Sequence, residues 1–248
     1  MVIVKKATQN QEVIDKISFL LNKLEVKFID VSFYIQAFIH RSIVNEKPDF
    51  APQHNERLEF LGDSVLELVI TDNLYRNFLD KNEGELTDIR SALVRGRNLA
   101  KVSRDLNFSE YLFLGKGEEI GGGRDSDYLL ANTLEAFIGA LYLDLGLENA
   151  RIFINRFIYP TLKDILENNY FKDFKSLIQE YSQAEFDITP TYEVLLEEGS
   201  DHDKNFKVGI YIGEKLIGSG FGSSKKKAQE QAAKNAYENK EKFINISK

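Results

Sequence analysis

The sequence contains no cysteine, and this absence removes several classes of protein from consideration. Disulfide-stabilised folds, cysteine-ligated zinc sites and thiol nucleophiles are excluded, and a cytoplasmic location is expected. No apolar run approaches the roughly 18–20 residues that a membrane span requires, so we expect no membrane partner. The first eleven residues also lack the apolar segment of a signal peptide.

Histidine and positive charge are also in short supply. Only His40, His54 and His202 are present, so a metal site would need mostly oxygen ligands, which favours Mg²⁺, Mn²⁺ or Ca²⁺. The chain carries 32 Lys and Arg residues against 39 Asp and Glu residues, for a net charge of −7. The chain as a whole therefore lacks the positive charge needed to attract a polyanion, and any contact with phosphate must come from a local cluster of basic residues.

The rest of the composition is that of a folded globular protein. Of 248 residues, 43% are apolar and 29% are charged, which excludes disorder and fits one large domain or two ordinary ones. From Gln11 to about Tyr159 the apolar residues follow helical spacing, and no alternating strand pattern is present. We predict an all-α domain with turns at 47–48, 82–84 and 121–123. Its helices beyond the first are expected at Val31–His40, Asn55–Phe78, Thr87–Asp105, Tyr128–Asp144 and Leu147–Phe157.

The pattern changes after Pro160. Leu162–Phe171 has the pattern of a short helical or irregular connector, and Asp173 can cap a helix that carries one apolar face. Three alternating or glycine-containing strands follow, at Thr191–Leu196, Phe206–Ile212 and Leu216–Phe221. Ser223 or Ser224 can cap a last helix, whose small alanine side chains would allow close packing on a sheet. The prediction is a small α+β domain in the order α-β-β-β-α.

One predicted helix presents a row of carboxylates. At about 100° per residue, Glu56, Glu59 and Asp63 fall within roughly 60° of one another. The apolar residues fall on the opposite side, at Leu58, Leu61, Val65 and Leu68. A solvated polar face would explain the three acids, but like charges on one face repel each other. A bound cation would turn that repulsion into attraction.

A second predicted helix, Tyr128–Asp144, is apolar nearly all round, as buried helices are. Asn132 and Glu135 interrupt it on a face shared with Gly139, which would let a neighbouring helix approach closely, as Gly62 would on the first helix. An ionised Glu there is costly unless it is paired or metal-bound, so a structural pair with Arg or Lys and a metal site both remain open. Two such helices offer oxygen ligands for Mg²⁺, an ion that serves phosphodiester cleavage.

A run of lysines, Lys225, Lys226 and Lys227, opens the last helix. Lysines in a first turn oppose the helix dipole at a cost of about 0.3–1 kcal/mol each. Three such unfavourable residues in a row suggest that they are kept for a function. Together with free helix N–H groups they would hold a polyanion backbone, although an ordinary solvated face is the other explanation. Further candidates for nucleic-acid contacts are Gln179, Gln183 and His202.

The segment from His54 to Leu66 closely resembles the signature of the bacterial ribonuclease III family. Supporting matches lie at Phe38–Ser42, Glu83–Thr87, Leu114–Glu118 and Leu134–Ala136. The tail resembles a double-stranded RNA-binding domain, through Pro190–Val194, Gly218–Gly220 and Lys225–Ala228. The resemblance covers nearly the whole chain. It implies a catalytic domain at 1–160, a connector at 161–171, an RNA-binding domain at 172–241 and a tail at 242–248.

This resemblance implies an endoribonuclease that hydrolyses both strands of double-stranded RNA with Mg²⁺, for which Mn²⁺ could substitute. The family acts as a homodimer with one cleavage centre per subunit, and it leaves 5′ phosphates and short 3′ overhangs. The expected work is the processing of ribosomal RNA precursors, structured messenger RNAs and transfer RNA.

The resemblance also implies roles for single residues. Positions of the family metal site are matched by Glu59, Asp63, Asn132 and Glu135, of which Asp63 and Glu135 would be central to catalysis. Glu56 would lie beside the site. Contacts to duplex RNA through 2′-hydroxyls and phosphates, which read A-form shape, would come from Gln179, Gln183, His202, Lys225 and Lys226.

Two departures from the family pattern bear on function. Asn132 stands where the family commonly has Asp, so it can offer a metal a carbonyl oxygen but no charge, and Ser200 stands where proline is usual. The alternative function is a double-stranded-RNA-binding protein that has lost cleavage, which Asn132 favours. The presence of Glu59, Asp63 and Glu135 favours the enzyme. A helical metal-binding protein unrelated to RNA would leave the tail unexplained.

Overall fold

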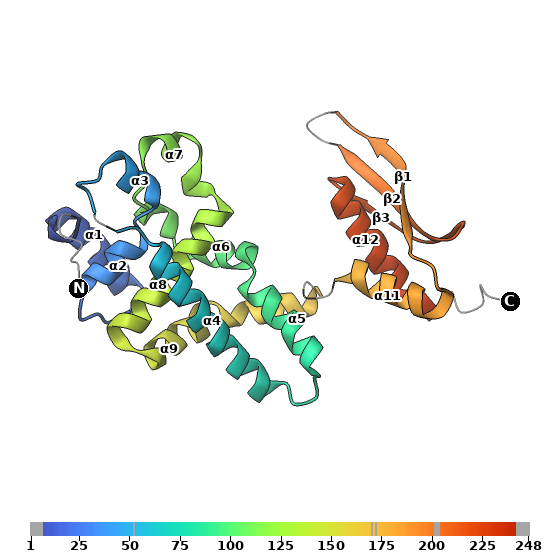
Figure 1. Ribbon diagram of the computed structural model, residues 1–248, viewed down its shortest axis with the longest axis horizontal. Helices are drawn as coiled ribbons and strands as arrows, with labels where there is room; N and C mark the ends of the chain where they lie inside the picture. Colours follow the sequence, from blue (N-terminus) through green and yellow to red (C-terminus); the bar gives the residue numbers. More distant parts are fainter. Residues whose placement is uncertain (1–6, 52, 170, 172, 201–203, 242–248) are drawn as a thin grey trace. The chain divides into compact units, whose positions relative to one another are not determined.

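The computed structural model describes residues 7–51, 53–169, 171, 173–200 and 204–241 (Figure 1). The chain divides into two compact units, residues 1–171 and 172–248. The first is helical and the second is a small α+β unit with a three-stranded sheet, so the predicted fold class is confirmed. His202 and residues 242–248 lie outside the described residues. Among the described residues, no helix has the length and apolarity needed to cross a membrane.

The helices of the first unit lie close to the predicted stretches. Its longer helices are α1 (Gln11–Lys23), α4 (Glu56–Asn77), α5 (Glu83–Val94), α6 (Gly96–Asp105), α8 (Asp127–Leu145) and α9 (Leu147–Phe157). Shorter α-helices are α2 (Val31–Ala37), α3 (Arg41–Glu46), α7 (Lys116–Ile120) and α10 (Leu162–Glu167). Single 3-10 turns are η1 (Ala7–Gln9), η2 (Phe108–Tyr111), η3 (Gly123–Asp125) and η4 (Tyr159–Thr161).

The prediction of one helix over Thr87–Asp105 was wrong. The chain instead forms α5 and α6, which are separated by Arg95 in an extended conformation (φ −60°, ψ 134°). The predicted turn at 82–84 is the start of α5, because Asn82 and Glu85 form a capping box in which each side chain accepts a hydrogen bond from the backbone N–H of the other. A segment that looked like a turn in sequence is therefore a helix N-terminus.

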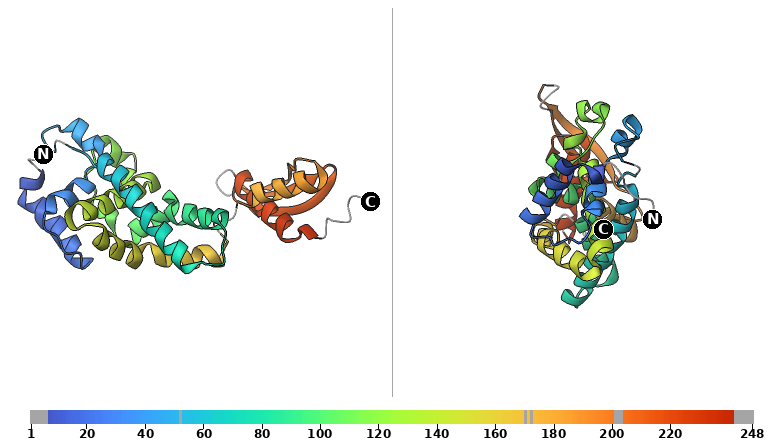
Figure 2. Two further views of the ribbon diagram at one scale, coloured as in Figure 1. Left: turned by 60° about the horizontal axis from the view of Figure 1, so that its bottom comes forward. Right: turned by 90° about the vertical axis from the view of Figure 1, so that its left-hand side faces the viewer.

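Helix α8 forms the centre of the first unit, with eleven of its 19 residues buried. Phe137 on α8 packs against the rings of Tyr34, Phe38, Phe108 and Phe153, all of them buried. A helix apolar on nearly every side must be covered by other elements, and Figure 2 shows α8 enclosed within the helical unit. The predicted buried helix is confirmed.

Helices α4 and α8 approach each other through glycine, as the sequence predicted. A Cβ atom placed on Gly62 would lie 1.7 Å from the carbonyl oxygen of Glu135, and one on Gly139 would lie 2.3 Å from that of Leu58. No side chain fits at either position without separating the helices. This contact fixes the spacing between the row of acids on α4 and the polar residues on α8.

The buried face of α4 is centred on Gly62. On the side predicted to lie opposite the acids, Leu58 and Val65 are buried, whereas Leu68, about 120° from Gly62, is 54% exposed. Glu59, about 60° from Gly62, is half-buried at the edge of the interface, and Glu56 and Asp63 lie further round and are exposed.

The second unit has the predicted order of elements. It consists of α11 (Phe174–Phe186), β1 (Thr191–Glu198), β2 (Asn205–Ile212), β3 (Lys215–Gly222) and α12 (Lys225–Glu238). The strands pair antiparallel in the order β1-β2-β3. Asp173 caps α11 and Ser224 caps α12 through their side-chain oxygens. Close packing of α12 on the sheet is confirmed, because a Cβ atom on Gly220 would lie 2.3 Å from the backbone nitrogen of Ala232.

Burial follows the predicted alternation in β2 but not in β1. In β2, Phe206, Val208, Ile210 and Ile212 are all buried. In β1, an edge strand with a register shift between Val194 and Leu196, both of these residues are more than 40% exposed. The irregularity breaks the two-residue period on which the prediction for β1 depended.

Candidate active site

The carboxyl groups of Glu59 and Asp63 on α4 and of Glu135 on α8 act on one another electrostatically. Burial, with the nearby charges of Asp63 and Glu59, raises the pKa of Glu135 to about 8. Among the described residues, none of the three acids has a Lys, Arg or His partner within ion-pair distance. The structural Glu–Arg or Glu–Lys pair left open by the sequence is therefore not present at Glu135, and ionising this carboxyl places a negative charge in a partly buried position without a cationic partner.

Asn132 lies beside Glu59. Burial is the main cause that raises the pKa of Glu59, and the charge of Glu56 adds to the rise, whereas a hydrogen bond with the Asn132 side chain opposes it. Glu59 and Asn132 also line one small cavity, together with His40, Arg41, Glu56 and Tyr128. The Asn132 amide therefore contacts Glu59 directly, and both side chains line the same cavity.

The donor set at this place fits a hard divalent cation. It offers carboxylate oxygens from two helices and one amide oxygen, and it contains a partly buried carboxyl group that has no cationic partner among the described residues. In the described part of the chain, no three His, Asp or Glu side chains already converge as a metal-binding group. The side chains would have to rotate toward one point, which their exposed or half-buried positions on α4 and α8 allow.

Glu56 faces Arg41 and His54, and it lines the same cavity as Glu59. Its carboxylate lies 3.5 Å from Arg41 Nη1 and 3.8 Å from His54 Nδ1. The His54 Nδ1 atom is buried and has no hydrogen-bond partner among the described residues. Glu56 is thus placed next to the site, as the resemblance implied, but its contacts are with basic side chains.

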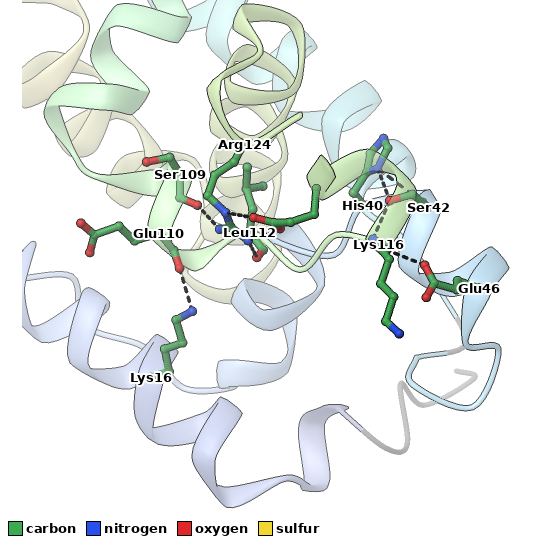
Figure 3. Close-up of polar contacts among 11 residues, drawn as sticks. Lys16, His40, Ser42, Glu46, Ser109, Glu110, Leu112, Lys116 and Arg124 are labelled. Atoms are coloured by element: carbon green, nitrogen blue, oxygen red, sulfur yellow. Dashed lines mark hydrogen bonds and ion pairs between the residues drawn. The ribbon is translucent and has the colours of Figure 1, made fainter. Parts of the chain in front are cut away.

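A hydrogen-bonded network holds the first turn of α3 in place (Figure 3). The Ser42 hydroxyl lies 2.8 Å from His40 Nδ1 and accepts a hydrogen bond of 2.9 Å from the backbone N–H of Gly115. Glu46 accepts a hydrogen bond from the backbone N–H of Lys116. Two motifs that are far apart in sequence, at 38–42 and 114–118, therefore form one rigid corner that carries Arg41.

A second network in Figure 3 fixes the segment that leads to this corner. Arg124 donates hydrogen bonds to the backbone carbonyls of Ser109 and Leu112 and forms an ion pair with Glu119. Lys16 donates to the carbonyl of Glu110 at 2.7 Å. Because Leu112 also lines the cavity, these contacts hold one of its walls.

The predicted RNA contacts of the second unit are exposed on α11 and α12. Gln179 and Lys226 have no partner among the described residues, and Gln183 bonds to Asp187 near the end of α11. Lys225 lies 3.8 Å from Glu197 and over the ring of Phe206. His202 lies outside the described residues, so its predicted role stays a prediction.

Sequence reasoning assigned no role to Arg41 and Tyr128, which line the cavity beside the acids. Arg41 belongs to a segment that matched the family pattern, but nothing in the sequence shows that it meets Glu56, 15 residues later. For Tyr128, the sequence offered only one signal, which was an aromatic residue close to the polar positions of α8. The structure shows that its side chain is exposed.

Comparisons with known proteins show which family the two units of the chain resemble. A family model described as Ribonuclease-III-like matches residues 30–162, and a double-stranded RNA binding motif matches residues 174–240. The chain is 43% identical to Ribonuclease 3 of Borreliella burgdorferi over 88% of this chain and 89% of that protein. It is 45% identical to Ribonuclease 3 of Treponema denticola over 86% and 87% of the two chains.

A solved structure is similar to part of this chain. The nuclease domain of ribonuclease III from Campylobacter jejuni, described with structural flexibility in a region involved in dimer formation, matches with a TM-score of 0.53 and 37% identity. The match covers 57% of this chain and 95% of that one.

Proposed function

The chain belongs to the ribonuclease III family of endoribonucleases, and we propose that it hydrolyses both strands of double-stranded RNA with Mg²⁺. Mn²⁺ would substitute for Mg²⁺, because both ions accept oxygen ligands. The observation that carries this proposal is the close approach of α4 and α8, which brings Glu59, Asp63 and Glu135 within electrostatic reach of one another.

The proposed metal ligands are Glu59, Asp63 and Glu135, with Asn132 offering a neutral carbonyl oxygen. When bound, a divalent cation lowers the pKa of a coordinated water and neutralises charge that develops on the phosphate. Asp63 is exposed and therefore accessible to RNA from solvent, whereas Glu135 is the most buried acid of the set. We assign Asp63 and Glu135 the central catalytic roles, because they hold the cation from opposite helices.

The second unit supplies affinity for the RNA duplex in this proposal. Gln179, Gln183, Lys225 and Lys226 would contact 2′-hydroxyls and phosphates, so the unit would read duplex shape more than sequence. The catalytic unit would act as a homodimer, in which each centre cuts one strand and leaves a 5′ phosphate with a short 3′ overhang. The substrates would be precursors of ribosomal and transfer RNA and structured messenger RNA, in the cytoplasm.

The proposal is tested by incubating the full chain with an end-labelled RNA duplex, first with Mg²⁺ and then with an excess of EDTA. We expect cleavage of both strands with Mg²⁺, products with 5′ phosphates, and intact RNA in EDTA. Single-stranded RNA of the same sequence is the control and should survive. Duplex binding without any cleavage in Mg²⁺ or Mn²⁺ would contradict the enzyme and support a binding protein, the function that Asn132 favours.

A further inference from the structure

Arg41 lies at the junction between the acidic centre and the exposed surface. It lines the cavity that also contains Glu59 and Asn132, and it pairs with Glu56 at 3.5 Å. Its backbone is fixed, because Ser42 and His40 tie the first turn of α3 to Gly115 (Figure 3). A rigid backbone with a two-thirds exposed side chain is suited to meeting a ligand from solvent.

Only one residue that lines this cavity in the described part of the chain can attract an anion at neutral pH. Of the residues that line it in the described part of the chain, Arg41 alone carries a permanent positive charge. His40 contributes little charge at neutral pH, since burial lowers its pKa and its Nδ1 accepts a hydrogen bond from the backbone N–H of Ser42. The other charged lining residues, Glu56 and Glu59, would repel a phosphodiester.

The ion pair with Glu56 is weak enough to be exchanged. The side chains of Arg41 and Glu56 are 66% and 48% exposed, and exposed pairs contribute only about 0–1 kcal/mol. A phosphate offers the guanidinium a charge-assisted, bidentate partner, which is a stronger interaction than a single contact at 3.5 Å. The pair is therefore better explained as a holding position for Arg41 than as a source of stability.

We propose that Arg41 binds a phosphate of the RNA strand being cut and so positions that strand over the carboxylates of α4 and α8. Glu56 holds the guanidinium at the mouth of the cavity until RNA arrives. This inference rests on the proposed function, because the anion is identified as RNA by that function, and it adds a contact outside the metal site and outside the second unit.

The test compares R41A and R41K with wild type in the full chain. Arg76 supplies the matched control. Like Arg41, it is an exposed arginine paired with an acid, Asp72, but it lies about 30 Å along α4 from Glu56. Duplex affinity is measured in EDTA over a range of salt concentrations, and steady-state cleavage is measured with Mg²⁺. Thermal unfolding of each variant is the folding control.

We expect R41A to weaken duplex binding and raise KM about 10- to 150-fold, the range for losing one charge-assisted contact. The slope of log affinity against log salt should fall by about one unit, because one phosphate contact is lost. R41K should lie between R41A and wild type, since it keeps the charge but not the planar fork. R76A should behave as wild type.

R41A with the affinity, salt slope and KM of R76A would overturn the inference. The inference would also be overturned if R41A and R41K lost cleavage equally while the slope of log affinity against log salt stayed unchanged in both. Such a result would indicate a structural effect and no lost phosphate contact. The binding measurements need no cleavage. A wild-type protein that binds duplex without cutting it would contradict the proposed function, while the comparison of R41A with R76A would still decide the role of Arg41.

Discussion

Replacing Glu135 by Gln should stabilise the metal-free protein while it abolishes cleavage. Glu135 is partly buried on α8, and burial together with the charges of Asp63 and Glu59 raises the pKa of its carboxyl to about 8. Gln has nearly the same volume and keeps the close contact between α4 and α8, but it carries no charge. The substitution therefore removes the cost of protonating this carboxyl, or of ionising it in a partly buried place, and it creates no cavity.

The sign and size of the effect follow from proton linkage. A carboxyl whose pKa is higher in the folded than in the unfolded chain binds a proton preferentially in the folded state. Its contribution to stability is present below about pH 4.5 and is lost as the pH rises toward 8. At pH 7 the shift corresponds to at most about 3 kcal/mol, and partial solvent exposure reduces this to about 1–2 kcal/mol.

The measurement is urea unfolding of wild type and E135Q in EDTA, from pH 4.5 to 8. The stability advantage of E135Q should be near zero at pH 4.5 and should grow to about 1–2 kcal/mol at pH 7–8. E148Q is the control, since Glu148 is an exposed side chain whose pairing with Arg151, when lost, should lower stability by about 0–1 kcal/mol. Equal stabilities of E135Q and wild type across this pH range would refute the reasoning. Added Mg²⁺ should stabilise wild type more than E135Q.

Three further predictions concern the metal site, the helix contact and the second unit. Asn132→Asp should lower the Mg²⁺ concentration for half-maximal cleavage, since it adds a charge facing the cation; an unchanged or higher Mg²⁺ requirement would place this residue outside the metal site. Gly62→Ala should lower the free energy of unfolding by about 1–3 kcal/mol or more, because its Cβ would overlap the backbone of α8. Gly117→Ala is the control, since its Cβ would enter open space and should not lower stability. Equal unfolding midpoints of the two variants in urea would contradict the close contact. Lys225→Ala with Lys226→Ala should flatten the salt dependence of duplex affinity by about 1–2 units with unchanged circular dichroism; an unchanged slope would mean that the lysines form only a solvated face.

Features that depend on neighbours along one helix could be predicted from the sequence. The spacing of Glu56, Glu59 and Asp63 and the small residues Gly62 and Gly139 indicated the face of α4 and its close approach to α8. Helix rotation alone sets these positions, so no knowledge of the tertiary fold was needed. The same is true of the order α-β-β-β-α in the second unit, where alternation and caps mark the elements.

Features that depend on distant segments could not be predicted. The contact of Arg41 with Glu56 and the bond from Gly115 to Ser42 join residues 15 and 73 positions apart. The break at Arg95 interrupts an apolar pattern that continues on both sides, and the period of the pattern contains no sign of it. In these places tertiary packing decides the conformation over local pattern.

The central claim is that the carboxylates on α4 and α8 form a metal-dependent centre that cuts RNA duplexes. The most direct test measures cleavage and binding of one labelled duplex by wild type, E135Q and E148Q at the same Mg²⁺ concentration. We predict that E135Q binds the duplex as tightly as wild type but does not cut it, and that E148Q does both. Full cleavage by E135Q at ordinary Mg²⁺ concentrations would contradict the claim, because the reaction would then proceed without the carboxylate at the centre of the site.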